Sequence, residues 1–171
     1  MQGSRFHSPV GEIRMLASDR GLAAIYFPVQ SGRIEPRLAP GGPRRGLGNV
    51  FLLQAEAFLA CYFDGDLDYS PDIPLDRYGS RFQMDVWNAI DGVPPGVRES
   101  YGDVAARMGR PGAARAVAGA LARNPLAILV PCHRIVGADG RLTGYAGGLP
   151  MKRLLLDHED RHADAVREES A

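Results

Sequence analysis

The sequence predicts a fold of the α/β (α+β) class: a small N-terminal sheet-plus-helix domain, then a mostly helical C-terminal domain with a helix-turn-helix. Three observations predict it. Residues 6–27 contain short apolar runs separated by turn residues, as strands do. From residue 49 onward, apolar residues recur with the period of helices. Between them, residues 31–48 are rich in Gly, Pro and Arg, which predicts a loop or linker.

The first domain is predicted to contain two or three short strands and one helix. The candidate inward residues of the strands are Ile13, Met15, Leu16, Leu22, Ile25 and Phe27. Asn49 is a good N-cap, and the following helix ends at Asp64-Gly65. Its predicted inner face comprises Phe51, Ala55, Phe58, Leu59 and Tyr62, with Cys61 as a small buried hydrophobe. The Pro-containing acidic stretch 66–78 then predicts a boundary, giving domains 1–79 and 80–159 and an acidic tail 160–171.

The second domain begins with a helix whose apolar stripe is Phe82, Val86, Ala89 and Ile90, with Trp87 beside it. Ser100 and Asp103 resemble a capping box and open a short helix that ends at Gly109 and Pro111. A second short helix, 112–123, follows almost at once. Two short helices joined by a tight turn are what a helix-turn-helix requires.

The second of these helices consists mostly of small residues, so it can approach another surface closely. Val117 and Leu121 are its large apolar residues, and Arg115 points away from Val117. By position alone, Arg115 fits solvent as well as it fits a ligand. A small-residue helix with one outward arginine favours a nucleic-acid groove.

Composition and charge exclude several classes of protein. The chain has 171 residues, of which 45% are hydrophobic and 23% charged, as in globular proteins. No apolar run approaches the ~20 residues that cross a bilayer, and no secretory signal is evident, so we expect a cytoplasmic protein without a membrane partner. The formal net charge is zero, yet residues 80–156 contain 10 basic and 5 acidic groups. This excess suits a polyanionic partner, although an arginine-rich genome explains the many arginines equally well.

A candidate nucleophile follows the helix-turn-helix. Asn124-Pro125 precedes the apolar run Ala127–Val130, which is suited to a buried strand, and Pro131-Cys132-His133-Arg134 comes next. A histidine near a cysteine can activate it, because the thiolate is the nucleophile. The pair by itself is weak evidence, and a buried thiol beside an unrelated histidine fits it better. Adjacent residues do not face each other on a strand, so either the chain turns there or a water relays the proton.

The C-terminal segment adds a loop, a helix and a carboxylate. The loop Gly144–Gly148 contains three glycines and can approach a ligand closely. Pro150 then starts a helix whose predicted apolar face is Met151, Leu154, Leu155 and His158. Glu159 shares this face. It is either solvated at a frayed end or accepts a hydrogen bond from His133, completing a Cys-His-Glu relay.

Together these residues resemble the O6-alkylguanine-DNA alkyltransferases, also called methylated-DNA–protein-cysteine methyltransferases. The resemblance covers about Phe82 to Glu159 and rests on Asn-Pro, Pro-Cys-His-Arg, Tyr-x-Gly-Gly-Leu and Leu-Leu-x-x-Glu at the family's spacing. It implies a DNA repair protein that flips O6-alkylguanine out of double-stranded DNA and transfers the alkyl group irreversibly to its own cysteine, in a single turnover without a cofactor.

The resemblance also implies the role of each matching residue. Cys132 would accept the alkyl group, His133 would generate its thiolate through a water, and Glu159 would orient His133. Asn124 would tie the turn to the active-site loop, and Arg134 would brace the two domains. Arg115 would replace the extruded nucleotide, and Tyr101 would help to rotate it. The other implied DNA-binding residues are Ala114, Ala118, Gly119 and Arg123, and those implied to line the substrate pocket are Val130, Pro131, Ile135, Tyr145, Ala146 and Gly147.

The first domain matches the family more loosely. Some members bind a structural zinc there, but His7 is the one plausible ligand in this region, so we predict no metal. We expect a monomer. Cooperative binding along DNA, activity on O4-alkylthymine and the preferred alkyl group remain open.

Three other functions compete with this prediction. A non-catalytic protein that binds alkyl lesions would lack the acceptor cysteine, which Cys132 supplies here. A cysteine hydrolase would leave the basic helix-turn-helix unexplained. A dual repair protein and transcription activator would need an additional N-terminal DNA-binding region, which we do not find.

Overall fold

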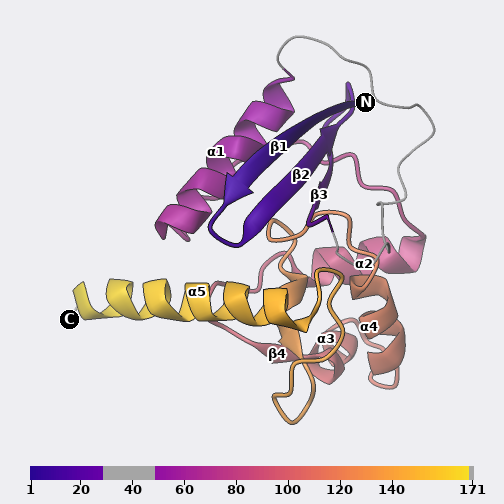
Figure 1. Ribbon diagram of the computed structural model, residues 1–171. Helices are drawn as coiled ribbons and strands as arrows, with labels where there is room; N and C mark the ends of the chain where they lie inside the picture. Colours follow the sequence, from indigo (N-terminus) through magenta and orange to yellow (C-terminus); the bar gives the residue numbers. More distant parts are fainter. Residues whose placement is uncertain (29–48, 170–171) are drawn as a thin grey trace.

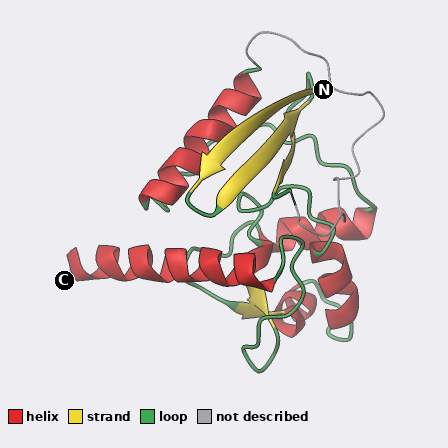
Figure 2. Ribbon diagram, in the orientation of Figure 1, coloured by secondary structure: helices red, strands yellow, loops and turns green. Residues whose placement is uncertain are grey.

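The computed structural model describes residues 1–28 and 49–169, except for the side chains of residues 164–169. The linker predicted at 31–48 lies outside these residues. The elements are β1 (Gln2–Ser8), β2 (Gly11–Ala17), β3 (Leu22–Tyr26), α1 (Val50–Asp64), α2 (Arg81–Ile90), β4 (Glu99–Ser100), α3 (Tyr101–Arg107), α4 (Ala114–Leu121), the 3₁₀ helix η1 (Cys132–Arg134), β5 (Ile135–Val136) and α5 (Leu149–Glu169). The fold is the mixed α/β class that the sequence predicts (Figures 1 and 2).

The N-terminal part is a three-stranded antiparallel sheet with α1 packed against it (Figure 1). The sheet order is β1-β2-β3, so the prediction of two or three strands is confirmed. In β2, Ile13, Met15 and Ala17 are buried, whereas Leu16 is half-buried on the other face. The prediction that Leu16 points inward is therefore wrong, because successive side chains of a strand point to opposite faces.

Helix α1 begins and ends where the sequence predicts. The Asn49 side chain accepts hydrogen bonds from the amides of Phe51 and Leu52, and Gly65 closes the helix with a φ of 96°. Leu52 also lies in the buried face, and the half-buried Phe51 packs against the same core. Cys61 is half-buried, so its prediction as a buried hydrophobe is wrong.

Residues 66–78, predicted as a boundary, are hydrogen-bonded to the sheet. The Leu22 amide donates to Pro74 O at 2.8 Å, and the Asp76 amide donates to Leu22 O at 2.9 Å. Ile73 is buried in the core. This segment therefore extends the edge of β3 before the chain enters α2.

The helices of the C-terminal part lie below the sheet in Figure 1, with α5 running under the layer formed by the sheet and α1. Helix α2 buries Val86, Trp87 and Ile90, and the Trp87 indole donates to Ala120 O of α4 at 3.1 Å. Ser100 and Asp103 form the predicted capping box of α3. Helices α3 and α4 pack against each other, and α4 is shorter than the predicted 112–123.

One apolar core runs through both parts of the chain. The contact is closest where Ile25 of β3 exchanges hydrogen bonds with the segment after α4. Its amide donates to Pro125 O at 2.9 Å, and its carbonyl accepts from the Ala127 amide at 2.8 Å. The sheet thus supports directly the turn that leads to Cys132.

Helix α5 is longer than predicted, and its buried face differs in part from the predicted one. It includes residues 160–169, which the sequence predicted as an acidic tail. Leu155, His158 and Glu159 are buried as predicted, and Lys152 and Leu156 are buried as well. Leu154, predicted inward, is 48% exposed. Among the described residues, no helix combines the length and apolar character that crossing a bilayer requires.

Replacing Asn49 with Ala should lower the free energy of unfolding by about 1 kcal/mol, because two amides at the start of α1 lose their acceptor. Urea unfolding at unchanged m-value measures this loss. Asn49→Asp is the control. It keeps the capping oxygen but loses the Nδ2 donor to Ser18 O, so it should retain most of the stability. An equal loss in both variants would assign the effect to the Ser18 contact.

Candidate active site

Cys132, the candidate nucleophile, lies at the end of a turn that one asparagine holds together. Asn124 follows α4 and is buried. Its Nδ2 lies 2.9 Å from Val130 O, 3.3 Å from Leu126 O and 3.1 Å from the Sγ of Cys132, and its Oδ1 accepts from the Leu126 amide at 3.0 Å. The side chain thus ties the exit of the helix-turn-helix to the cysteine, as expected of Asn124.

The apolar run 127–130 is a turn, and its prediction as a strand is wrong. Only Leu126 forms a bridge, with Ile25. Ile128 has a φ of 69°, a left-handed conformation that is unfavourable for a β-branched residue. The turn is held by the burial of Ile128 and the hydrogen bonds of Asn124. Periodicity could not find it, because a short apolar run suits a buried turn as well as a buried strand.

Cys132 is the first residue of η1 and is 6% exposed. Burial raises the pKa of its thiol, while the Asn124 hydrogen bond and the charge of Lys152 oppose this effect. The thiol is therefore protonated at neutral pH. A base must remove its proton before the sulfur can act as a nucleophile.

His133 is the candidate base, and it follows Cys132 in the 3₁₀ helix η1 rather than on a strand. Its ring is wholly buried, and Nε2 lies 2.7 Å from Oε1 of Glu159. Burial lowers the pKa of His133, and Glu159 opposes this only in part. The ring is neutral, and since an ionised carboxylate only accepts, Nε2 carries the hydrogen. Nδ1, which has no hydrogen-bond partner among the described residues, is left to take a proton.

Glu159 is fully buried and ionised, so the solvated alternative does not hold. Burial would raise the pKa of its carboxyl, but the charges and hydrogen bonds of His133 and Arg134 hold that pKa well below its usual range. Arg134 donates to both carboxylate oxygens, with Nε 3.0 Å from Oε2 and Nη2 2.8 Å from Oε1. Its Nη1 donates to Val93 O. The link from Arg134 to the N-terminal part runs through Glu159, which accepts from Tyr62 of α1.

Lys152, which sequence reasoning missed, joins three elements around the site. It is the one lysine of the chain, and its ammonium is buried. Its Nζ donates to Ile135 O at 2.5 Å and to Thr143 O at 2.9 Å. Burial lowers its pKa to about 8. The signal was present in the sequence, because Lys152 lies at i−7 from Glu159 on the same helix face.

Tyr101, the first residue of α3, is fastened to the same loop. Its hydroxyl donates to Thr143 O at 3.0 Å and lies 3.5 Å from the Nζ of Lys152. Tyr101, at the start of the helix-turn-helix, and Lys152 of α5 therefore donate to the same carbonyl, that of Thr143. Whether Tyr101 touches a substrate stays a prediction.

The loop Gly144–Gly148 places Tyr145 near Cys132 and Glu159. The Tyr145 hydroxyl is buried with no hydrogen-bond partner among the described residues. A Cβ at Gly147 would lie 2.9 Å from the Tyr145 ring and 3.2 Å from both Phe27 and Met151, so this glycine is needed for packing within the protein. Of the other predicted pocket residues, Ala146 is half-buried, and Val130, Pro131 and Ile135 are buried around Cys132.

The predicted DNA-binding residues lie on α4 and just after it. Arg115 is exposed, and Ala114, Ala118 and Gly119 are half-buried. Arg123 is exposed and donates from Nη1 to Gly119 O at 2.8 Å. The outward position predicted for Arg115 is thus present, on a helix of small residues.

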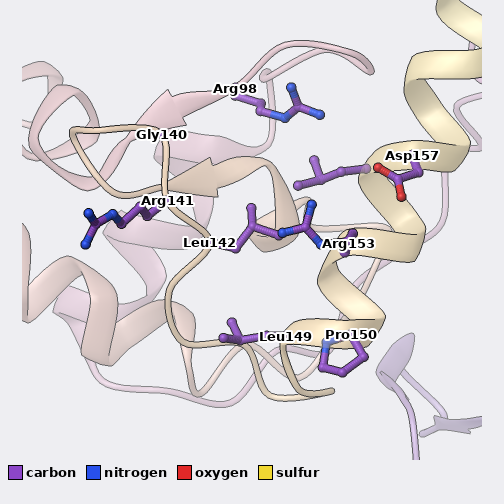
Figure 3. A pocket seen from close by; sticks show the side chains of 9 residues that line it. Arg98, Gly140, Arg141, Leu142, Leu149, Pro150, Arg153 and Asp157 are labelled. Carbon is purple, nitrogen blue, oxygen red and sulfur yellow. The ribbon is translucent and has the colours of Figure 1, made fainter.

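A hollow of about 760 Å³ lies apart from the cysteine, between the start of α5 and the loop after β5 (Figure 3). Arg98, Arg141 and Arg153 line it, together with Asp157. Arg98 and Arg141 each have a carboxylate partner, at 2.5 Å and 3.0 Å, so the hollow is not strongly positive.

Among the described residues, no three His, Cys, Asp or Glu side chains are grouped as a metal site. The absence of metal therefore stays a prediction.

Comparison with known proteins gives a consistent result. Residues 81–161 match the family model described as 6-O-methylguanine DNA methyltransferase, DNA binding domain. A methylated-DNA–protein-cysteine methyltransferase of Methanosarcina acetivorans is 42% identical, over 90% of this chain and 95% of that protein. One from Mycolicibacterium paratuberculosis is 43% identical, over 92% of both. The crystal structure of Mycobacterium tuberculosis OGT in complex with DNA matches with a TM-score of 0.78 at 38% identity, covering 95% of this chain and 94% of that one.

Replacing Glu159 with Gln should lower the free energy of unfolding at pH 7 by about 3–5 kcal/mol, because Arg134 remains buried without a counter-charge. The folded-state pKa of Glu159 is depressed, so its contribution is present above the unfolded value near 4.5 and is lost as pH falls below it. The difference in free energy of unfolding between the wild type and Glu159→Gln should therefore narrow below about pH 4.5.

Denaturant unfolding from pH 3 to pH 8 measures this difference. Asp157→Asn is the matched control, since it neutralises an exposed carboxylate on the same helix. A pH-independent difference for Glu159→Gln would show that the ionised carboxylate is not the source of the stability.

Proposed function

The chain belongs to the methylated-DNA–protein-cysteine methyltransferase family, and from this premise we propose that it repairs DNA by moving an alkyl group from O6-alkylguanine in double-stranded DNA to its own Cys132. Two contacts carry the proposal: Asn124 Nδ2 lies 3.1 Å from the Sγ of Cys132, and Nε2 of the next residue, His133, lies 2.7 Å from Oε1 of Glu159. A buried thiol, a neutral imidazole and an ionised carboxylate in this order form a unit that can make a thiolate.

The proposed proton path starts from the tautomer of His133. His133 takes the thiol proton at Nδ1, through a water, because Nε2 already donates to Glu159. The imidazolium that forms is stabilised by the Glu159 carboxylate. The thiolate that forms is stabilised by the Nδ2 of Asn124 and the charge of Lys152.

The transfer itself balances without a cofactor. The sulfur lone pair forms the S–C bond to the alkyl carbon, and the bond between this carbon and O6 breaks, its electron pair going to guanine. Guanine then takes up one proton, equal in number to the proton lost by the thiol. A thioether has no leaving group that water can displace readily, so each molecule reacts once.

Burial of Cys132 requires the base to leave the stack, since a duplex cannot bring O6 to a sulfur that is 6% exposed. Helix α4 has small residues on its outer side, which suits close approach to a minor groove. Arg115 is the side chain that would fill the gap left by the flipped nucleotide. Unstacking costs a few kcal/mol, less for a lesion that already pairs badly.

The first test is intact mass spectrometry after mixing the protein with a duplex containing O6-methylguanine, followed by peptide mapping. We expect a stoichiometric gain of one methylene on Cys132. Cys132→Ala should gain nothing, while Cys61→Ala, which removes the half-buried second thiol, should react as the wild type does.

Each alternative predicts a different result in this test. Binding without any change of mass would favour a non-catalytic protein that binds alkyl lesions. If the protein neither binds the duplex nor reacts with it, the proposal is wrong. A methylene gained on Cys61 would show that Cys132 is not the acceptor.

A second test concerns Arg115. Arg115→Ala should slow transfer from duplex DNA by about tenfold or more at limiting protein, because nothing fills the vacated stack. Transfer from a single-stranded oligonucleotide should change much less. Arg153→Ala, which removes an exposed arginine from the first turns of α5, is the control. Equal losses on both substrates would mean that Arg115 acts through charge rather than by insertion.

A further inference from the structure

One contact to the catalytic carboxylate comes from the opposite part of the chain. Tyr62, on the last turn of α1, donates its hydroxyl hydrogen to Oε1 of Glu159 at 2.9 Å, across 97 positions of sequence. Oε1 is also the atom that faces the Nε2 of His133 at 2.7 Å. Among the described residues, the other hydrogen-bond partners of Glu159 are His133, Arg134 and Gly96, which all lie within residues 80–159. Tyr62 thus joins α1 directly to the atom that orients the base.

The Tyr62 side chain is held in this position from several sides. Its ring packs edge-on against Phe63 at 5.1 Å and lies 5.1 Å from the ring of His158. Its backbone carbonyl is 2.7 Å from the Nε2 of His158. Burial and the nearby Glu159 raise its pKa well above the usual value, so the phenol is neutral and always a donor to this carboxylate.

A donor on Oε1 changes what the carboxylate does to His133. It takes up part of the negative charge that would otherwise attract a proton on the imidazole. It also prevents the carboxylate from turning away from Nε2, because Arg134 and Tyr62 approach the same oxygen as His133 does. Both effects favour the neutral ring with Nδ1 unprotonated, which is the form that accepts the thiol proton.

We propose that Tyr62 is a positioning residue for alkyl transfer: its hydroxyl holds Oε1 of Glu159, and through it the His133 ring, so that the N-terminal part of the chain takes part in activating Cys132. The inference rests on the proposed function for its role in transfer. Its effect on His133 can be measured without DNA.

Several charged or titratable groups share this environment and must stay unchanged in the test. Arg134 from η1 and Lys152 from α5 lower the pKa of His133, and Glu159 raises it. Tyr145, Cys132 and His158 also face the carboxylate or its partners. A substitution that removes only one hydroxyl leaves all of them in place.

Tyr62→Phe is that substitution, since it keeps the ring and its packing against Phe63 and His158. The Glu159 carboxylate should then attract a proton on His133 more strongly. We expect the His133 pKa, followed by NMR of the imidazole in the free protein, to rise by about half a pH unit to one pH unit. The acidic limb of the profile of transfer rate against pH should move upward by the same amount. Single-turnover transfer should therefore slow by about 3- to 10-fold on that limb and approach the wild-type rate well above it.

Tyr69→Phe is the matched control, because it removes a hydroxyl from a partly exposed tyrosine beyond α1. It should leave the His133 pKa and the transfer profile unchanged. Affinity for unmodified duplex should be the same in both variants.

Two results would overturn the inference. One is an unchanged His133 pKa in Tyr62→Phe. The other is a loss of rate that is uniform with pH, which would mark Tyr62 as merely structural. If the wild-type protein does not transfer an alkyl group at all, the proposed function fails. The NMR titration then still decides whether Tyr62 controls the protonation of His133.

Discussion

The site depends on the contacts that compensate one buried charge, the carboxylate of Glu159. Glu159 has no exposed surface, so its charge is tolerable only with full compensation by Arg134, His133 and Tyr62. These partners come from η1 and from α1, whereas Glu159 belongs to α5. Satisfying one charge therefore fixes three elements relative to one another. In the part of the chain that the structure describes, the other ring nitrogen of His133 has no hydrogen-bond partner.

The second constraint is the turn between α4 and η1. Ile128 in a left-handed conformation is costly, and the turn persists because Asn124 binds both its ends and Ile25 pairs with its start. The cost is met by contacts from the sheet. The small N-terminal sheet is thus a support for the cysteine as well as a separate layer. This arrangement explains why one apolar core runs through both parts of the chain.

Much of the fold and of the site could be predicted from local patterns. The cap of α1 at Asn49, the capping box at Ser100 and the closing Gly65 depend on neighbouring residues, so the sequence shows them directly. The Cys132-His133 pair and the helical position of Glu159 are visible for the same reason. The errors fall where a pattern is locally ambiguous. The run 127–130 suits a strand or a turn, and the apolar face of α5 could be drawn with Leu154 or with Lys152.

The sequence by itself determined most of the elements, the caps of α1 and α3, and Cys132 as the candidate nucleophile, because these follow from interactions within a few residues. Only the tertiary structure decided that Glu159 is buried and ionised, that Lys152 points inward, and that the Tyr62 hydroxyl reaches the Glu159 carboxylate. Helical periodicity says which residues share a face, but it does not say what that face meets. The charge state of a buried group depends on partners that are distant in the chain, and only folding brings them within hydrogen-bond distance.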